Sequence, residues 1–324
     1  MKALVYGAGI IGCYLTHMLS LGGNEVTLLA RGKWKDTLSE HGLEIRHHLQ
    51  RKTTLDRPRV IGEIDDTCYD AVFAVMPMSE ITAILPALAR VRTPLVVMVG
   101  NNTRAEEMHR EILELAGDTR EILFAFQVTA GRKEEERVVV ERFGASGLDI
   151  GALHGEVSEK ARETLTALFS GTGYALHWQE DMEAYLFCHP AAVLPIAYLA
   201  YACGGDLRRS TRQGRRDMLD AAREAYTVLS QLGIPILPKG DERFFTPGPK
   251  RMLMSLLYFI MAKTDIGDLV ACEHCRHAVK EMEMLSCDFE KLLAKKPDAT
   301  LKAWHRLKNR MPSWEELHAR YDGR

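Results

Sequence analysis

The sequence predicts an α/β protein in which a domain built on a parallel sheet precedes an all-helical domain. Short apolar runs alternate with helical stretches over the first half, a pattern typical of right-handed crossovers and an open parallel sheet. A glycine-rich turn joins the first apolar run to the first helical stretch. From about residue 157 the pattern changes to long helical periods. We therefore expect one domain over 1–156 and a second over 157–324.

The apolar runs of the first half lack the alternation of half-exposed strands, so we expect strands that are covered on both faces. A first helix should begin at Ile10 and end at the pair Gly22–Gly23. The expected strands are 2–6, 25–30, 70–75, 94–99 and 121–126, and the helices between them are 10–21, 79–90 and 104–115. Two more strands, 137–142 and 148–151, should form an antiparallel pair at the sheet edge.

The second half predicts helices joined by one turn-rich stretch with four prolines, 233–249. The expected helices are 157–170, 181–203, 215–232, 249–262, 266–286 and 299–310. Residues 184–205 carry no charged side chain and are long enough to span a bilayer. Pro190 and Pro195 interrupt them, and proline removes a helical hydrogen bond. We therefore expect a buried helix of a soluble, cytoplasmic protein that does not bind membranes.

The overall charge excludes a dedicated nucleic-acid-binding protein. Lysine and arginine number 42 and aspartate and glutamate 44, which leaves a net charge of −2 and no cationic excess to displace phosphate counterions. Seven scattered cysteines favour reduced thiols over a disulfide scaffold. Cys272, His274, Cys275 and His277 stand close together, but one helix turns the thiols and the imidazoles to different faces. We expect no metal site there.

The segment Gly7-Ala8-Gly9-Ile10-Ile11-Gly12 matches the dinucleotide-binding pattern G-x-G-x-x-G between a strand and a helix. Gly7 permits the tight turn, Gly9 lets the backbone approach a pyrophosphate, and Gly12 lets the helix pack closely on the sheet. The helix that follows begins at Ile10, and its first residues, Ile10 and Ile11, offer unpaired N–H groups to phosphate. The sequence therefore predicts a Rossmann-type nucleotide site.

The end of the second strand predicts which nicotinamide cofactor binds. An acidic residue there would hold a ribose 2′-hydroxyl, but this chain has Arg31 and Lys33 and no acid before Asp36. A guanidinium suits a phosphate dianion by charge and by its forked geometry. We expect NADP rather than NAD, although both cations could also be ordinary surface residues.

With these motifs the chain resembles the ketopantoate reductase family, the NADP-dependent 2-dehydropantoate 2-reductases. The matching segments are Val5–Gly12, Leu28–Gly32, Gly42–Leu43, Leu148–Gly151 and Thr264–Ile266. The resemblance implies an NADPH-binding Rossmann domain, a 2-oxo acid substrate between the domains, and hydride transfer to the keto carbon. It also implies a lysine on the first long helix that protonates the developing alkoxide, and a glutamate and an asparagine that hold ligands.

Several family positions differ in this chain. Phe187 stands where the catalytic lysine belongs, and Pro77 replaces a second lysine after the third strand. Asn101 matches the ligand-holding asparagine after a shift of one residue and would contact both cofactor and substrate. Asp265 matches the glutamate, one methylene shorter, in catalytic and substrate-binding roles. Ser255 matches a substrate-binding serine if two residues are deleted.

Phenylalanine cannot donate a proton, so another group must do so if the chain is a reductase. Candidates are His189, Tyr185 and Lys263 beside Asp265. His189 has the most suitable intrinsic pKa, yet a single histidine in an apolar helix is usually a core residue, and Lys263 could form a plain ion pair. We expect an NADPH-dependent reductase of a small 2-oxo acid or related carbonyl, or else a catalytically silent NADP(H)-binding or sensing protein of the same fold.

The C-terminal tail predicts an amphipathic helix. Trp304, Leu307 and Met311 would pack on the body of the protein or on a partner subunit. A homodimer is therefore a possible assembly.

Overall fold

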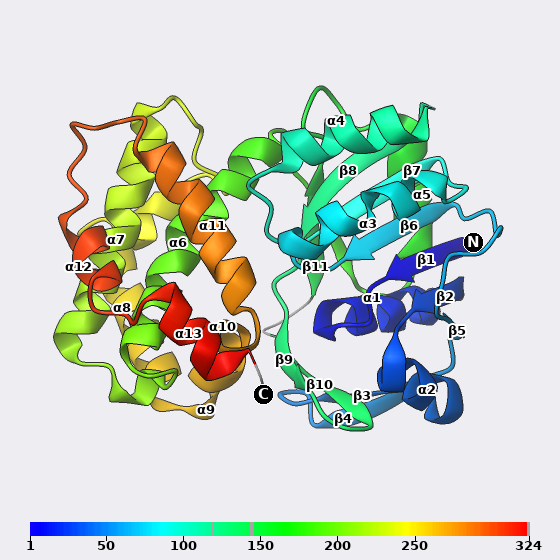
Figure 1. Cartoon of the computed structure of the whole chain (residues 1–324), viewed down its shortest axis with the longest axis horizontal. Helices are drawn as coiled ribbons and strands as arrows, with labels where there is room; N and C mark the ends of the chain where they lie inside the picture. The colour runs from blue at the N-terminus through cyan, green and yellow to red at the C-terminus, as the bar shows by residue number, and fades with distance from the viewer. Residues whose placement is uncertain (118, 143–145, 323–324) are drawn as a thin grey trace. The chain divides into compact units, whose positions relative to one another are not determined.

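The computed structural model describes residues 1–117, 119–142 and 146–322, which form two compact units (Figure 1). The first unit comprises Met1–Gly100 and Arg104–Met182, and the second comprises Asn101–Thr103 and Glu183–Arg324. The boundary expected at 156/157 differs from this division. The reason is that β12 (Ala175–Trp178) pairs with β11 (Gly147–Gly151) at the end of the sheet, and α5 (Glu159–Leu168) buries its apolar face in the same core.

The first unit is built on an eight-stranded sheet of order β12-β11-β8-β7-β6-β1-β2-β5. All the neighbouring strands of this sheet are parallel except β11 and β8, which are antiparallel. Its remaining strands are β1 (Lys2–Tyr6), β2 (Glu25–Leu29), β5 (Arg59–Ile61), β6 (Ala71–Val75), β7 (Leu95–Val99) and β8 (Glu121–Phe126). The central strands β6 and β7 are buried along their whole length, which confirms the expectation drawn from their continuous apolar runs.

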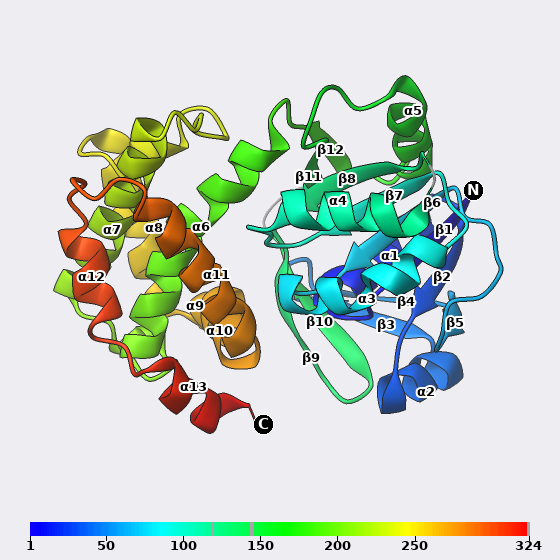
Figure 2. The same cartoon turned by 45° about the horizontal axis from the view of Figure 1, so that its top comes forward.

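Four helices follow the strands of this sheet as crossovers or covers. They are α1 (Ile10–Leu21), α2 (Gly32–His41), α3 (Met78–Arg90) and α4 (Ala105–Ala116). Helices α1, α3 and α4 lie within two residues of their predicted bounds. Helix α2 was not predicted. It lacks a continuous apolar face, and Leu38 is its one buried residue. Helices α3 and α4 lie side by side (Figures 1 and 2).

A second, four-stranded sheet has the order β4-β3-β10-β9 and packs beside α1 (Figure 2). Its strands are β3 (Leu43–His47), β4 (Lys52–Asp56), β9 (Ala130–Lys133) and β10 (Arg137–Glu141). The expected antiparallel pair of 137–142 with 148–151 is wrong. Strand β10 pairs in parallel with β3 and β11 pairs with β8, because each strand finds a buried apolar partner far away in the sequence.

Two buried histidines connect α1 to this small sheet. His17 Nδ1 lies 2.8 Å from the Asp56 carboxylate, and His47 Nε2 lies 2.9 Å from the Thr54 hydroxyl. The two rings lie 5.2 Å apart, centroid to centroid. Burial lowers the pKa of His47 from 6.5 to about 4, and the nearby charge of His17 adds to this effect. His47 is therefore neutral in the folded protein at pH 7.

We expect acid to destabilise the first unit through His47. Between about pH 6.5 and pH 4 the unfolded chain binds a proton at this residue and the folded protein does not, so the free energy of unfolding falls as the pH is lowered. The loss should be on the order of 2–3 kcal/mol at 1.36 kcal/mol per pKa unit. Urea unfolding at pH 7 and pH 4.5 should show a smaller difference for His47→Gln than for the wild type. The exposed His41, changed to Gln, should leave the difference as it is; an unchanged difference in His47→Gln would contradict the assignment.

The second unit is helical. Its long helices are α6 (Met182–Ala202), α7 (Arg212–Gln231), α8 (Pro249–Lys263) and α11 (Val279–Leu293), and shorter ones are α12 (Lys302–Lys308) and α13 (Trp314–Tyr321). The single helix expected over 266–286 is instead broken. A short turn α9 (Asp265–Gly267), a π-helical turn over 268–272 and α10 (Glu273–His277) precede Ala278, whose ψ of 38° ends the helical path. The chain thus turns between α10 and α11.

Helix α6 is the one helix among the described residues that has the length and apolar composition of a membrane span, and 72% of its most apolar window is buried inside the protein. Tyr198 and Tyr201 are among its fully buried side chains. The hydroxyl of Tyr198 lies 2.7 Å from that of Ser286, and the hydroxyl of Tyr201 donates to the carbonyl of Cys275. This burial is typical of the core helix of a folded unit.

Helix α12 docks on α7 through two acidic side chains. The fully buried carboxylate of Asp217 accepts from Arg306 and Arg310, with N–O distances of 2.9 Å. Glu224, two turns further along α7, accepts from the backbone N–H groups of Ala303 and Trp304 at the start of α12. Trp304 and Leu307 are 0% exposed. The tail therefore packs on the body of the protein, which decides between the two packings that the sequence allowed.

Candidate nucleotide site and a histidine cluster

The glycine loop joins β1 to α1, and two of its glycines are sterically required. Gly7 has a φ of +120°, and a Cβ atom there would lie 2.2 Å from the carbonyl oxygen of Val75. A Cβ atom on Gly12 would lie 1.9 Å from the carbonyl oxygen of Gly7. Neither contact is possible, so both glycines allow the loop, the sheet and the helix to approach each other.

Gly9 differs from these two because a Cβ atom there would meet nothing within 4 Å. It is exposed and forms the N-cap of α1 with a φ of −77°. The first turn, which starts at Ile10 and Ile11, holds no acidic side chain. Open space above a helix N-terminus whose first turn holds no acidic residue fits a pyrophosphate. The residues present therefore suit a dinucleotide.

Arg31 and Lys33 are exposed at the start of α2, with Arg31 as the N-cap residue. The guanidinium of Arg31 donates to the hydroxyl of Tyr6 at 2.9 Å, and the indole of Trp34 donates to the carbonyl of Ala8 at 2.9 Å. These bonds tie α2 to the end of β1 and to the glycine loop. The first turn of α2 also lacks an acidic residue. A phosphate here would meet a helix N-terminus and two cations.

Lys263, the candidate proton donor, ends α8, and Asp265, matched to the family glutamate, begins α9. The Lys263 ammonium donates to the backbone carbonyls of Arg208 and Ser210. The side chain of Asp265 is 92% exposed and lies 4.0 Å from the guanidinium of Arg208. Both residues thus belong to an exposed corner of the helical unit, where Lys263 links the end of α8 to the turn at 208–210.

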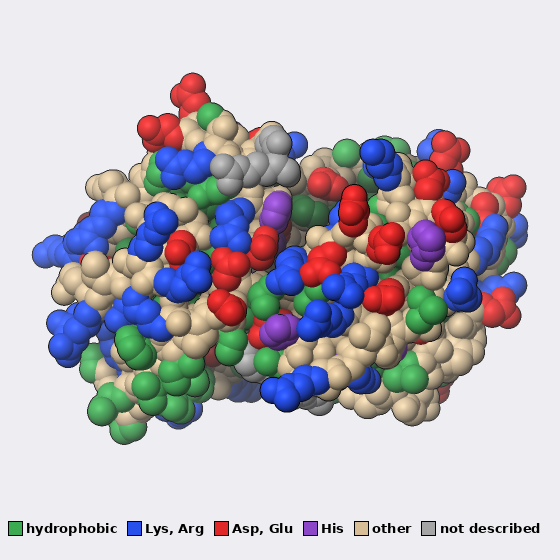
Figure 3. Space-filling model, turned by 90° about the horizontal axis from the view of Figure 1, so that it is seen from below, with side chains coloured by type: hydrophobic (Ala, Val, Ile, Leu, Met, Phe, Trp, Pro, Cys, Tyr) green, Lys and Arg blue, Asp and Glu red, His purple; other side chains and the backbone are tan. Residues whose placement is uncertain are grey.

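Ser255 is exposed on α8 among apolar neighbours. Large hydrophobic side chains at least 44% exposed share this helix, namely Met252, Leu253, Leu256, Leu257, Phe259 and Ile260. Figure 3 shows hydrophobic side chains gathered in this way at the lower left, with lysine and arginine side chains beside them. These side chains form an exposed apolar face on α8. The homodimer stays a prediction.

Helix α6 carries Phe187 at the position of the missing lysine and His189 two residues further on. Phe187 is half-buried and packs against the hydrophobic core of the helical unit. Burial lowers the pKa of His189 to about 4, and the charge of His274 acts in the same direction. His189 is therefore neutral at pH 7, which suits a core residue and makes it a poor general acid.

Asn101 lies in a cluster that sequence reasoning missed. Its Nδ2 donates to Glu281 Oε1 on α11 at 2.9 Å, and the other carboxylate oxygen of Glu281 lies 3.6 Å from His274 Nε2 on α10. Glu281 is 4% exposed. The seven-residue spacing of His274 and Glu281, two helical turns, was the available signal.

Cys272 and Cys275 face the core while their neighbouring histidines face outward. The two thiols are 1% and 3% exposed, and burial raises the pKa of both. His277 pairs with Glu273 at 3.0 Å. Among the residues that the structure describes, no three potential ligands gather in a way that could hold a metal ion.

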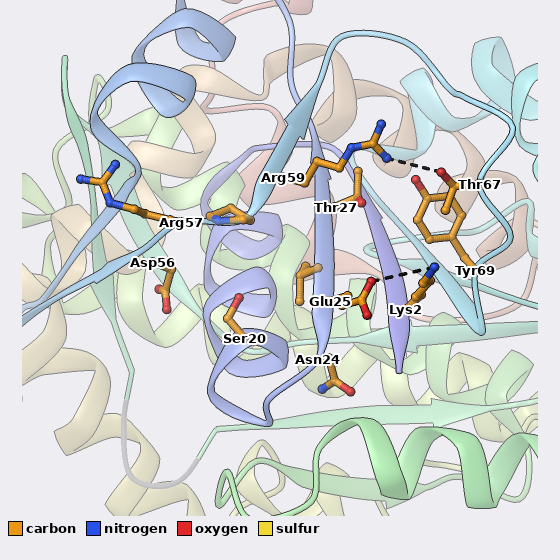
Figure 4. A pocket seen from close by; sticks show the side chains of 12 residues that line it. Lys2, Ser20, Asn24, Glu25, Thr27, Asp56, Arg57, Arg59, Thr67 and Tyr69 are labelled. Atoms are coloured by element: carbon orange, nitrogen blue, oxygen red, sulfur yellow. Dashed lines mark hydrogen bonds and ion pairs between the residues drawn. The ribbon is translucent and has the colours of Figure 1, made fainter.

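A cavity of about 460 Å³ opens on the first unit, away from the glycine loop. Lys2, Glu25 and Arg59, which line it, are the first residues of β1, β2 and β5. Figure 4 shows Lys2 close to Glu25 and Arg59 reaching toward Thr67. The cavity thus lies at the amino ends of the strands, whereas open α/β sheets bind ligands at the carboxyl ends. We do not assign it to the nucleotide.

The first unit matches a known family. Residues 3–155 match the model of the family described as ketopantoate reductase PanE/ApbA, which confirms the resemblance inferred from the glycine loop. The chain is also 26% identical over 252 residues to the "Uncharacterized oxidoreductase YkpB" of Bacillus subtilis (strain 168), covering 76% of this chain and 80% of that protein.

Solved structures share the fold of the whole chain. A PanE/ApbA family ketopantoate reductase from Ralstonia eutropha JMP134 is similar with a TM-score of 0.69 and 16% identity, over 99% of this chain and 100% of the other. A D-mandelate dehydrogenase in a ternary structure with NADH and anilino(oxo)acetate gives a TM-score of 0.69 and 16% identity, over 99% of both chains. These likenesses show a shared fold, and the family match over residues 3–155 supports an oxidoreductase.

Proposed function

We propose that this chain, whose residues 3–155 match the model of the ketopantoate reductase PanE/ApbA family, is an NADPH-dependent reductase of a small 2-oxo acid or a related carbonyl compound. The observation that carries the proposal is the open space above Gly9, next to a helix N-terminus and with Arg31 at the start of α2. The family match and the shared fold support the reaction type.

The chain's own residues would bind and orient the dinucleotide. The backbone at Gly9, Ile10 and Ile11 would hold the pyrophosphate, and Arg31 with Lys33 would hold the 2′-phosphate. When bound, the dihydronicotinamide supplies a hydride. The Arg31 guanidinium contacts the hydroxyl and the ring of Tyr6. These contacts would limit the conformations of the Arg31 side chain in the free protein and so reduce the entropy lost on binding.

Cofactor choice can be tested at Arg31. Arg31→Ala should raise the dissociation constant of NADPH about 10- to 100-fold, since a hydrogen bond to a charged group contributes about 1.5–3 kcal/mol, and should leave NADH binding unchanged. Calorimetric titration of both cofactors measures this. Arg57→Ala, an exposed arginine beside the cavity at the amino ends of the strands, is the matched control. Equal affinity of the wild type for NADH and NADPH would contradict the selection of a phosphate. This comparison matters because the similar D-mandelate dehydrogenase was solved with NADH.

A second candidate function is a silent NADP(H)-binding or sensing protein, which Phe187 and Pro77 favour because neither can replace a lysine. NADPH oxidation with a panel of 2-oxo acids, ketopantoate included, separates the two. Turnover at ordinary enzymatic rates with any member supports the reductase. Tight NADPH binding without turnover supports the silent protein.

A further inference from the structure

We propose that the outer face of α8 binds the same face of a second copy of this chain, so that the protein is a two-fold symmetric dimer. The inference goes beyond the reductase proposed above and does not depend on it. The observation behind it is a row of large apolar side chains along α8. Each is at least 44% exposed, and they are Met252, Leu253, Leu256, Leu257, Phe259 and Ile260.

Helix α8 is apolar on nearly its whole circumference but packs on the protein with one side only. Residues 252–262 include no charged side chain. Met254, Tyr258 and Met261 pack against the core of the helical unit, while the opposite side is exposed. A helix that is hydrophobic all round is normally buried, and a large apolar patch on a protein surface marks an interaction site. We therefore infer that a partner covers the outer side.

The outer face is symmetric about Leu256. At about 100° per residue, Leu256 lies in the middle of this face, opposite the packed side. An antiparallel pairing centred on this residue places it against its own copy. The same pairing sets large side chains opposite large side chains, namely Met252 opposite Ile260 and Leu253 opposite Phe259. A two-fold interface needs such a self-complementary patch because each contact occurs twice. The face therefore fits a second copy of α8, whereas a lipid surface would not require this symmetry.

The exposed area is sufficient for the apolar part of a stable dimer interface. Large side chains bury about 150–250 Å² each when they are covered completely, so six of them at about half exposure present on the order of 500 Å². A stable interface takes about 800 Å² from each partner, of which roughly 55–65% is apolar. The guanidinium of Arg215, 5.2 Å from the centre of the Phe259 ring, adds the polar rim typical of such interfaces.

The charged residue of α8 on the outer face, Lys263, does not oppose this pairing. Its ammonium donates to two backbone carbonyls of the turn at 208–210. In the antiparallel arrangement its counterpart is Pro249, so like charges do not face each other. The positions beside the face, Ser255 and Leu257, are uncharged. Helices that lie on membranes instead carry lysine and arginine on the face opposite their apolar side, which in α8 is packed on the core.

Leu256→Glu tests the surface, and Leu115→Glu is its matched control. Leu115 is 48% exposed on α4, in the first unit. In the dimer the two new carboxylates would face each other, so we expect Leu256→Glu to raise the dissociation constant of the dimer at least about 100-fold. Its circular dichroism spectrum should stay unchanged, and Leu115→Glu should remain dimeric. Analytical ultracentrifugation over a series of concentrations measures the dissociation constant.

Leu256→Cys tests the symmetry. The exposed thiols of Cys68 and Cys287 are first replaced by serine. Two cysteines that meet on a two-fold axis can form a disulfide, so mild oxidation should convert most of the Leu256→Cys protein into a covalent dimer. Leu115→Cys in the same background should stay uncrosslinked. A dimer that Leu256→Cys does not crosslink would overturn the antiparallel arrangement.

The other outcomes decide whether α8 binds a second copy at all. A wild type that is monomeric at every concentration up to about 100 μM would overturn the proposal, and so would a dimer that Leu256→Glu leaves intact. Binding of wild-type monomers to phosphatidylglycerol vesicles, lost in Leu256→Glu, would overturn it in favour of a membrane surface. The reductase is tested separately by turnover, so failure of the dimer leaves the proposed function standing.

Discussion

Replacing Gly9 by alanine will abolish tight NADPH binding and leave the fold intact. A Cβ atom at Gly9 meets no protein atom within 4 Å, and the residue's φ of −77° is open to alanine. The folded state should lose about 1 kcal/mol or less, the cost of alanine at an N-cap. A bound pyrophosphate, however, would need the space that the methyl group fills. We expect an affinity loss of at least about 100-fold, or 2.7 kcal/mol, measured by NADPH fluorescence titration beside thermal unfolding.

Gly12→Ala is the contrasting variant for this experiment. Its Cβ atom would lie 1.9 Å from the carbonyl oxygen of Gly7, so α1 must move away from the loop. We expect a loss of about 1–3 kcal/mol in folding free energy together with the loss of binding. If Gly9→Ala binds NADPH as tightly as the wild type, the phosphate does not approach the loop and the nucleotide site is wrongly assigned.

Asp217→Asn should strongly destabilise the helical unit. The carboxylate is 0% exposed and holds two arginines of α12. The amide removes the negative charge and leaves Arg306 and Arg310 facing a neutral buried group. Breaking a buried pair from one side costs on the order of 3–5 kcal/mol, and the partial exposure of the two guanidinium groups should keep the loss near about 3 kcal/mol. Urea unfolding followed by circular dichroism measures it.

Asp220→Asn is the matched control, three residues along the same helix. Its carboxylate is 28% exposed and lies 2.9 Å from Arg251. A partly exposed pair of this kind contributes less than about 1 kcal/mol. Equal losses in the two variants would show that the contact between α7 and α12 does not depend on the buried charge.

Local signals in the sequence were sufficient to predict the central strands and most helices of the first unit. Apolar runs predicted the central strands because a strand covered on both faces needs continuous hydrophobic residues. Other elements had a signal that was not used, such as α13, whose start carries the capping box of Ser313 and Glu316. The antiparallel pairing of 137–142 with 148–151 failed because nearness in sequence does not decide which strands share a sheet.

The residues of the candidate site, too, could be predicted from the sequence only in part. The glycine loop could be read directly because its spacing reflects a local turn whose backbone approaches phosphate. Lys263 and Asp265 could not be assessed, because their exposure and their engagement with the turn at 208–210 depend on how α8 packs. His189 was singled out by its place on α6, yet only its burial shows that it is uncharged at neutral pH.

By itself the sequence determined the strands β1, β2, β6, β7 and β8, the helices α1, α3 and α4 between them, the glycine loop, and the cations Arg31 and Lys33. Each of these depends on residues within one or two turns of chain, where local sterics and hydrophobic spacing act. Only the tertiary structure decided the boundary near Met182 and the meeting of Asn101 with Glu281. Those residues are 180 positions apart, and the packing that joins them is a property of the whole folded unit that no local pattern encodes.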